Sequence, residues 1–363
     1  MLSKAAVIYN PGEKYVIENI EVASPKANEV MVKVAGCGLC HTDELAQNGT
    51  IPVQMPIVLG HEGAGVVVEV GPGVEGISVG DHVVLSYSSC GHCEMCLTGN
   101  ANVCVNNFKL NFGGAMSDGT TRLSLNGKEL ANFFGHSSFG NYAVANQRNV
   151  VVVDKDVDLT ILGPLGCGIQ TGAGTVLNGL RCKFGTSIAV FGTGAVGCSA
   201  IMAAKIAGCQ NIIAIDIIPE KLQLAKEIGA THVINSKEVE DVVKEIQKIT
   251  NGGAHYSVET TGVPALVNQA LYCLRTMGHC AVVGVSGDVT INVFNAIMME
   301  GRIMQGFIQG NAVPQLFIPK LVQYYKAGLF PFEKLIKVYD LEQINEAYDD
   351  VHKGKALKAV VKM

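Results

Sequence analysis

The sequence contains no run of about 18 apolar residues, which is the length that an α-helix needs to cross a bilayer. Its N-terminus also lacks the long apolar core of a secretory signal peptide. Because neither feature of a membrane or exported protein is present, we expect a soluble, cytoplasmic protein.

A surplus of positive charge is missing as well. The 27 Lys and Arg residues are scattered, and 32 Asp and Glu residues bring the formal net charge to −5. Clustered positive charge is what attracts nucleic acid and acidic membrane surfaces. We therefore expect neither a nucleic-acid partner nor a membrane partner.

Low-complexity segments are absent from the 363 residues, and 48% hydrophobic residues are typical of a folded chain. The length fits two domains at roughly 100 to 200 residues each. There are 12 cysteines. Since the cytosol keeps thiols reduced, metal binding or catalysis explains them better than a disulfide framework.

The pattern of predicted secondary structure changes along the chain. Residues from about 1 to 165 form short β-rich segments separated by glycine, which is typical of a β-barrel-like domain. From Ser187 onward, apolar strands alternate with helical stretches such as 220–228, which predicts a doubly wound parallel sheet. The expected strands are 188–191, 212–215, 232–234, 256–258 and 281–283. Beyond about residue 310 this alternation fades, and we expect the tail to rejoin the first domain.

A nucleotide-binding motif follows the first strand of that sheet. Gly192, Gly194 and Gly197 form Gly-x-Gly-x-x-Gly ahead of an Ala-rich helical stretch, 200–207. The first glycine allows a tight turn, the second lets a pyrophosphate approach the helix N-terminus, and the third permits close helix packing. The alternative, three glycines that only make a turn, lacks a reason for the flanking strand and helix.

An acidic residue indicates which dinucleotide is bound. Asp216 ends the next strand, where its carboxylate can accept hydrogen bonds from the ribose hydroxyls and repel a 2′-phosphate. No arginine follows in residues 217–221. The sequence therefore predicts NAD rather than NADP.

A compact cysteine loop indicates a second ligand. Four cysteines have the spacing C-x2-C-x2-C-x7-C, at Cys90, Cys93, Cys96 and Cys104. Four thiolates can close a tetrahedron around zinc and leave no open position, which is typical of a structural site. An iron–sulfur site or plain buried cysteines are the alternatives.

Three shorter motifs complete the pattern: Cys40-His41-Thr42-Asp43, Gly60-His61-Glu62 and Gly166-Cys167-Gly168. Each is ambiguous alone, but in this order, with the cysteine loop and the nucleotide motif, the whole chain resembles the zinc-dependent medium-chain alcohol dehydrogenases. The resemblance implies an α/β fold with a GroES-like catalytic domain at residues 1–168 and 309–363, which carries both zinc sites. It implies a Rossmann NAD-binding domain at residues 169–308.

The resemblance also implies a catalytic zinc held by Cys40, His61 and Cys167, with Glu62 close enough to approach the metal. Three protein ligands leave a position for a substrate oxygen, where the metal acts as a Lewis acid. Thr42 is expected to accept the alcohol proton. Family members with a full proton relay carry a histidine at the position of Leu45. Since leucine cannot carry a proton, the sequence does not indicate the route of the proton beyond Thr42.

Further contacts follow from the same resemblance. Asp43 is expected to orient the histidine ligand. His41 and Lys358 are expected beside the cofactor pyrophosphate. The residues assigned to the rest of the cofactor are Gly192, Gly194, Ala195, Val196, Gly197, Asp216 and Lys221.

Three segments most resemble aryl-alcohol dehydrogenases: 39–43, 163–172 and 313–321. They predict a primary aryl or allylic alcohol such as benzyl alcohol as substrate, with Tyr87 and Phe139 as pocket walls or, equally, core aromatics. An aliphatic alcohol dehydrogenase and a glutathione-dependent formaldehyde dehydrogenase stay open, as does a non-catalytic zinc-ribbon scaffold. A homodimer or homotetramer is expected from the resemblance.

Overall fold

The computed structural model describes residues 1–363, which divide into two compact units. The first unit comprises residues 1–168, 313–323 and 333–363, and the second comprises 169–312 and 324–332. No helix in either unit combines the length and the apolar character that crossing a bilayer requires. The α/β fold class predicted from the sequence is confirmed.

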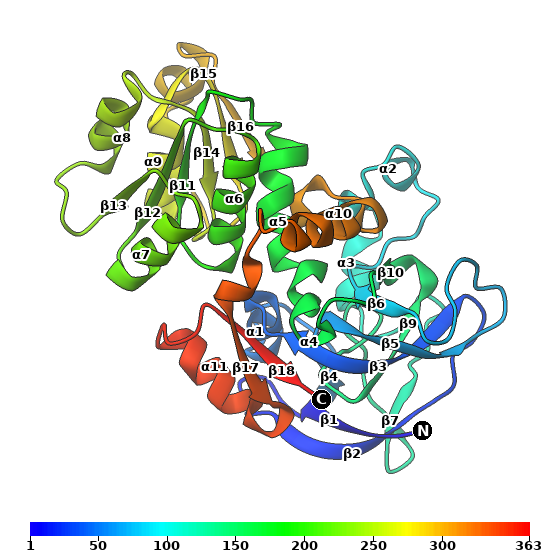
Figure 1. Ribbon diagram of the computed structural model, residues 1–363. Coiled ribbons are helices and arrows are strands. Elements are labelled where there is room, and N and C mark those ends of the chain that lie inside the picture. Colours follow the sequence, from blue (N-terminus) through cyan, green and yellow to red (C-terminus); the bar gives the residue numbers. More distant parts are fainter. The chain divides into compact units, whose positions relative to one another are not determined.

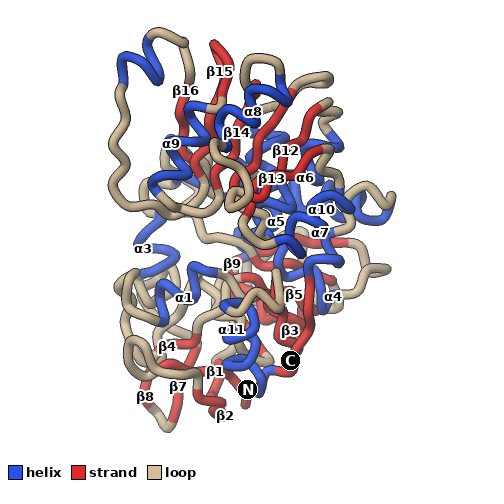
Figure 2. The backbone as a smooth tube through the Cα atoms, turned by 90° about the vertical axis from the view of Figure 1, so that its left-hand side faces the viewer, coloured by secondary structure: helices blue, strands red, loops and turns tan.

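Two sheets form most of the first unit. The five-stranded sheet has the order β4-β1-β2-β7-β8, and the second sheet has the order β10-β6-β5-β3-β18-β17 with β9 also paired to β3. Figure 2 shows β1, β2, β7 and β8 next to one another. The strands are β1 Leu2–Ile8, β2 Val16–Val22, β3 Glu29–Gly38, β4 Ile57–Val58, β5 Glu62–Val70, β6 His82–Leu85, β7 Leu123–Leu125, β8 Lys128–Glu129, β9 Tyr142–Asn146, β10 Val150–Val153, β17 Ile336–Asp340 and β18 Lys358–Lys362.

The helices of the first unit are short and connect these strands. They are α1 His41–Gln47, α2 Glu94–Leu97, α3 Asn107–Phe112, α4 Leu159–Leu162 and α11 Ile344–His352, while α10 Pro314–Lys326 starts in this unit. Side chains on one face of β3, β5 and β6 pack into a valine-rich core, which includes Val32, Val67 and Val83. This core fixes the strand ends from which the candidate ligands project.

A six-stranded parallel sheet, ordered β13-β12-β11-β14-β15-β16, organises the second unit (Figure 1). The strand order reverses after β13, and right-handed crossovers then place α6 and α7 on one face and α8 and α9 on the other. The predicted doubly wound sheet is therefore confirmed. The elements are α5 Gly168–Gly174, β11 Ser187–Phe191, α6 Ala195–Ile206, β12 Asn211–Asp216, α7 Pro219–Ile228, β13 His232–Asn235, α8 Val242–Thr250, β14 Ala254–Glu259, α9 Pro264–Tyr272, β15 Leu274–Val282 and β16 Ile303–Gly306.

The C-terminal return of the chain differs from the predicted segment 309–363. Residues 309–312 and 324–332 belong to the second unit. For residues 309–312 the reason is close packing within that unit, because the backbone of Gly310 lies against Gly174. The last strand does return to the first unit, where β18 pairs antiparallel with β3.

Candidate metal centres and nucleotide site

Four side chains with metal-binding groups meet in the first unit, at Cys40, His61, Glu62 and Cys167. Cys40 lies between β3 and α1, and His61 and Glu62 lie at the start of β5. Cys167 follows a 3-10 turn at Gly163–Gly166. One ligand atom from each residue lies within 4.8 Å of the others.

Asp43 fixes the ring of His61. The Nδ1 atom of His61 lies 2.9 Å from Asp43 Oδ1, and both residues are fully buried. Because a carboxylate only accepts hydrogen bonds, Nδ1 carries a proton, which leaves Nε2 as the ring nitrogen whose lone pair a metal can take. That Nε2 atom is buried and has no hydrogen-bond partner. A buried lone pair among two thiols and a carboxylate fits a zinc ion well.

We expect Asp43→Asn to lower zinc affinity and activity by about 10- to 100-fold. The Oδ1 atom of Asp43 also accepts from the Gly60 N–H at 3.0 Å, and Oδ2 accepts from the Cys40 N–H at 3.1 Å. An amide has one oxygen, so it leaves one of these donors without an acceptor. Zinc content by atomic emission and kcat/KM would measure the effect. Glu44→Gln in the same helix is the control, and equal losses in both variants would contradict an orienting role for Asp43.

The two thiols of this cluster influence each other. A hydrogen bond from the Cys167 thiol holds the pKa of Cys40 well below its usual range, although burial opposes this. The same contact, together with burial, raises the pKa of Cys167. The pair therefore gives up one proton easily and retains the second. A divalent cation favours the loss of both protons, since thiolates are the ligating form.

Lys358 is paired with Glu62 of the metal-binding cluster. Its Nζ is buried, 2.8 Å from Oε1 and 2.6 Å from Oε2 of Glu62, and it also donates to the Leu39 carbonyl at 2.8 Å. Burial raises the pKa of Glu62 to about 7, although the Lys358 ammonium pulls it down. An isolated buried ammonium is costly, so the Glu62 carboxylate stabilises Lys358 at the start of β18. Its expected place beside a cofactor pyrophosphate stays a prediction.

The remaining predicted residues of the first unit lie on or near α1. Thr42 is half-buried in its first turn, and His41 is exposed with Nδ1 3.0 Å from Glu44 Oε2. Leu45 follows in the same helix. The position of His41 is compatible with an anion at its surface, and its contact with a cofactor stays a prediction.

Two aromatic rings that the sequence did not predict lie beside His61. The ring of Phe134 stacks on the imidazole with centroids 4.4 Å apart, and Phe133 approaches edge-on at 5.7 Å. Phe139 is instead fully buried against Tyr15, so it is a core aromatic rather than a pocket wall. Tyr87 lines a cavity of about 170 Å³ together with Cys96. No local pattern marks Phe134, because its neighbour in space is 73 positions away in sequence.

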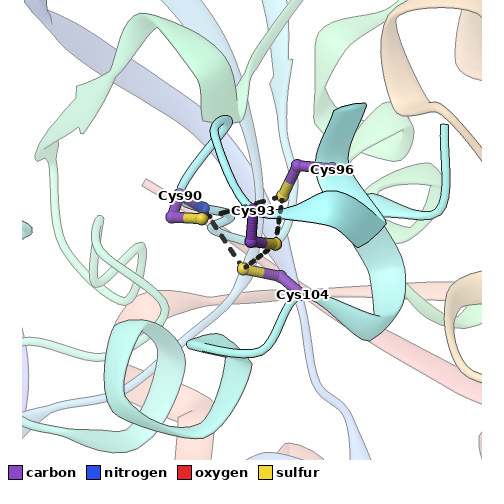
Figure 3. A group of neighbouring side chains, drawn as sticks. All are labelled: Cys90, Cys93, Cys96 and Cys104. Carbon is purple, nitrogen blue, oxygen red and sulfur yellow. Dashed lines mark hydrogen bonds between the residues drawn. The ribbon is translucent and has the colours of Figure 1, made fainter. Parts of the chain in front are cut away.

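The cysteine loop brings its four thiols together as well. Figure 3 shows the side chains of Cys90, Cys93, Cys96 and Cys104 pointing toward one another. The sulfur of Cys93 lies 3.5 Å from that of Cys96 and 3.8 Å from that of Cys104, and Cys90 lies 3.9 Å from Cys96. All four ligand atoms lie within 4.8 Å, which suits a closed tetrahedral S4 site.

Backbone amides prepare this loop for a cation. The N–H of His92 donates to the Cys90 sulfur and lowers the pKa of that thiol to about 5. The backbone of Cys96 likewise lowers the pKa of Cys93. Amide donors of this kind stabilise the thiolate form that a metal binds.

The glycines of the nucleotide motif have the predicted environments. Gly192 has φ +87°, and a side chain there would strike Thr260 and Thr261. A Cβ on Gly197 would lie 1.9 Å from the Gly192 carbonyl, whereas Gly194 faces open space. Gly194 precedes α6, where Ala195 and the next residue, Val196, begin the helix. The open backbone at a helix N-terminus fits a pyrophosphate.

Asp216 lies at the carboxyl end of β12, beside this loop. Its Oδ2 atom accepts from the N–H and the hydroxyl of Thr193, at 2.8 and 2.7 Å. Lys221 stands in the following helix α7. The structure thus places the motif and its acidic partner together within the second unit, while the contact of Thr193 was not predicted.

Comparison with known proteins covers nearly the whole chain. Residues 26–155 match the model of the alcohol dehydrogenase GroES-like domain, and residues 195–323 match that of the zinc-binding dehydrogenases. A geraniol dehydrogenase from Castellaniella defragrans is 41% identical over 364 residues, covering 99% of this chain and 97% of the relative. A probable S-(hydroxymethyl)glutathione dehydrogenase 1 from Schizosaccharomyces pombe is 38% identical over 365 residues, with 99% and 97% coverage. The crystal structure of benzyl alcohol dehydrogenase from Acinetobacter calcoaceticus has a TM-score of 0.96 and 42% identity, with 100% and 99% coverage.

Proposed function

Because the chain belongs to the zinc-dependent medium-chain alcohol dehydrogenase family, we propose that it reversibly oxidises a primary alcohol to the aldehyde with NAD. The preferred alcohol is aryl or allylic, such as benzyl alcohol. The observation that carries the proposal is the cluster of Cys40, His61 and Cys167, in which the buried Nε2 lone pair of His61 has no partner.

In this proposal Cys40, His61 and Cys167 hold a catalytic zinc, which supplies a Lewis acid for the alcohol oxygen when bound. The chain supplies two thiolates and a neutral imidazole that Asp43 orients. Thr42 accepts the proton of the alcohol. Leu45 has no group that could take this proton further. The proton therefore leaves through water or with the help of His41 on α1.

The cysteine loop binds a second zinc that stabilises its own fold, because four protein ligands leave no position for a substrate. NAD binds the second unit through Gly192 to Gly197 and Asp216. The carboxylate of Asp216 repels a 2′-phosphate and so selects NAD over NADP. One relative's name alone does not decide the substrate, but geraniol and benzyl alcohol share an unsaturated carbon next to the alcohol carbon.

A homodimer or homotetramer also stays a proposal. Strand β16 forms one edge of the six-stranded sheet, and its Ile303 side chain is half exposed. An unpaired edge with exposed apolar side chains supports pairing with a second copy.

Steady-state rates with NAD test the substrate class. We expect kcat/KM for benzyl alcohol, cinnamyl alcohol and geraniol to exceed that for ethanol by at least about 10-fold, because each additional buried carbon adds transition-state binding. An adduct of glutathione and formaldehyde is the competing substrate, and preference for it would assign the chain to the glutathione-dependent branch.

Metal analysis separates the enzyme from a scaffold. Two zinc ions per chain with NADH binding, measured by fluorescence titration, agree with the proposed enzyme. One zinc per chain without NADH binding would contradict it and indicate a non-catalytic zinc-ribbon protein.

A further inference from the structure

The carboxylate of Asp216 is saturated by donors from its own chain. Its Oδ2 atom accepts the Thr193 N–H at 2.8 Å and the Thr193 hydroxyl at 2.7 Å. Its Oδ1 atom accepts the N–H groups of Ile217 at 2.7 Å and Ile218 at 3.1 Å. A carboxylate offers about four lone-pair positions, and these four donors occupy all of them.

A ribose hydroxyl must therefore displace one of these donors. Three of the four are backbone amides, which the Gly192–Gly194 turn and the start of α7 hold in place. The fourth is the hydroxyl of Thr193, which swings away by rotation about a single side-chain bond. Thr193 has no exposed surface, so its hydroxyl cannot turn toward bulk water.

We propose that the Thr193 hydroxyl occupies, in the free protein, the position on Asp216 that the adenosine ribose takes, and that it thereby limits affinity for the dinucleotide. This inference rests on the proposed NAD-dependent function. When the dinucleotide binds, Asp216 exchanges its hydrogen bond from the Thr193 hydroxyl for one from the ribose hydroxyl. The buried Thr193 hydroxyl then has no acceptor, which costs free energy. Thr193 is thus a residue that sets cofactor affinity, although it carries no charge.

Thr193→Val tests the exchange, because valine has the same shape but no hydroxyl. We expect it to bind NADH and ADP-ribose about 3- to 10-fold more tightly than the wild-type protein, the usual effect of one hydrogen bond. Valine gives Asp216 no side-chain donor, so the ribose hydroxyl takes the fourth position without leaving a buried hydroxyl unpaired. Isothermal titration calorimetry with ADP-ribose measures the binding without any catalytic turnover.

Three controls isolate the mechanism. Thr193→Ser keeps the hydroxyl and should bind ADP-ribose as the wild type does. NADPH should gain nothing from Thr193→Val, because Asp216 still repels the 2′-phosphate. In an Asp216→Ala background the valine substitution should leave ADP-ribose binding unchanged, since the two residues act as one unit.

The outcomes separate two hypotheses. Equal or weaker binding of ADP-ribose by Thr193→Val, with the wild type binding normally, overturns the exchange and leaves the proposed function intact. If the wild-type protein binds neither NADH nor ADP-ribose, both the proposed function and the exchange at Asp216 are contradicted. If the valine variant does not fold, as judged by its thermal transition, Thr193→Ala removes the same hydroxyl with less bulk.

Discussion

Replacing Cys167 with alanine is expected to lower kcat/KM for alcohol oxidation by more than about 10³-fold and to reduce bound zinc from two ions to one per chain. Loss of a residue that only orients a ligand costs about 10- to 100-fold, and loss of the ligand itself removes a direct metal bond. Cys40 and His61 alone cannot complete the three-ligand set of a catalytic zinc. Steady-state kinetics and atomic emission on the same preparation measure both effects.

Cys37→Ala is the matched control for this variant. Cys37 is a fully buried cysteine in β3, three positions before Cys40, and it is not a member of the metal-binding cluster. It should retain both zinc ions and most of the activity, at a small cost in stability. Full activity with two zinc ions in Cys167→Ala would remove Cys167 from the ligand set.

The second large effect is expected from Cys93→Ser in the cysteine loop. This change should release one zinc and destabilise the protein by at least about 3 kcal/mol, which corresponds to a fall in Tm of roughly 6 to 12 °C. The estimate lies below the ~10–16 kcal/mol of zinc-finger peptides, because only this loop depends on the metal. Differential scanning calorimetry and zinc analysis provide the measurement.

His92→Gln lies in the same loop and serves as its control. The ring of His92 is exposed, and its Nδ1 contacts the Cys90 carbonyl at 2.9 Å rather than the sulfur cluster. Tm and zinc content should stay close to the wild-type values. A Cys93→Ser protein that keeps two zinc ions and an unchanged Tm would argue against a structural metal in this loop.

Much of the fold was predictable because its signals are local. The strands and helices between residues 187 and 283 repeat an alternation that each segment reveals by itself, and the structure has the first four strands at the expected places. The fifth strand, predicted at 281–283, is longer and starts earlier, as β15 Leu274–Val282. The C-terminal return was less predictable. Strand β18 pairs with β3, more than 300 positions earlier, while residues 324–332 join the other unit. The local sequence pattern of residues 310–363 indicates neither the pairing of β18 with β3 nor the position of residues 324–332 in the second unit.

The candidate sites divide in the same way. Cys90 to Cys104 lie within 15 positions, so their spacing alone indicates a shared ligand. Cys40, His61 and Cys167 are spread over 128 positions, and only a resemblance to a family connected them before the structure brought them within 4.8 Å. Asp43 was expected beside His61 for the same reason.

The sequence by itself determined the two loops that bind ligands through neighbouring groups, the four-cysteine loop and the Gly192–Gly197 turn. In both, the chain is too short between its functional groups to place them far apart. The tertiary structure decided which partner each buried polar group has. It paired Lys358 with Glu62, across 296 positions, and the hydroxyl of Thr193 with Asp216. Such pairs form because folding buries a charged or polar group and leaves only its spatial neighbours to satisfy it, and those neighbours depend on packing rather than on local periodicity.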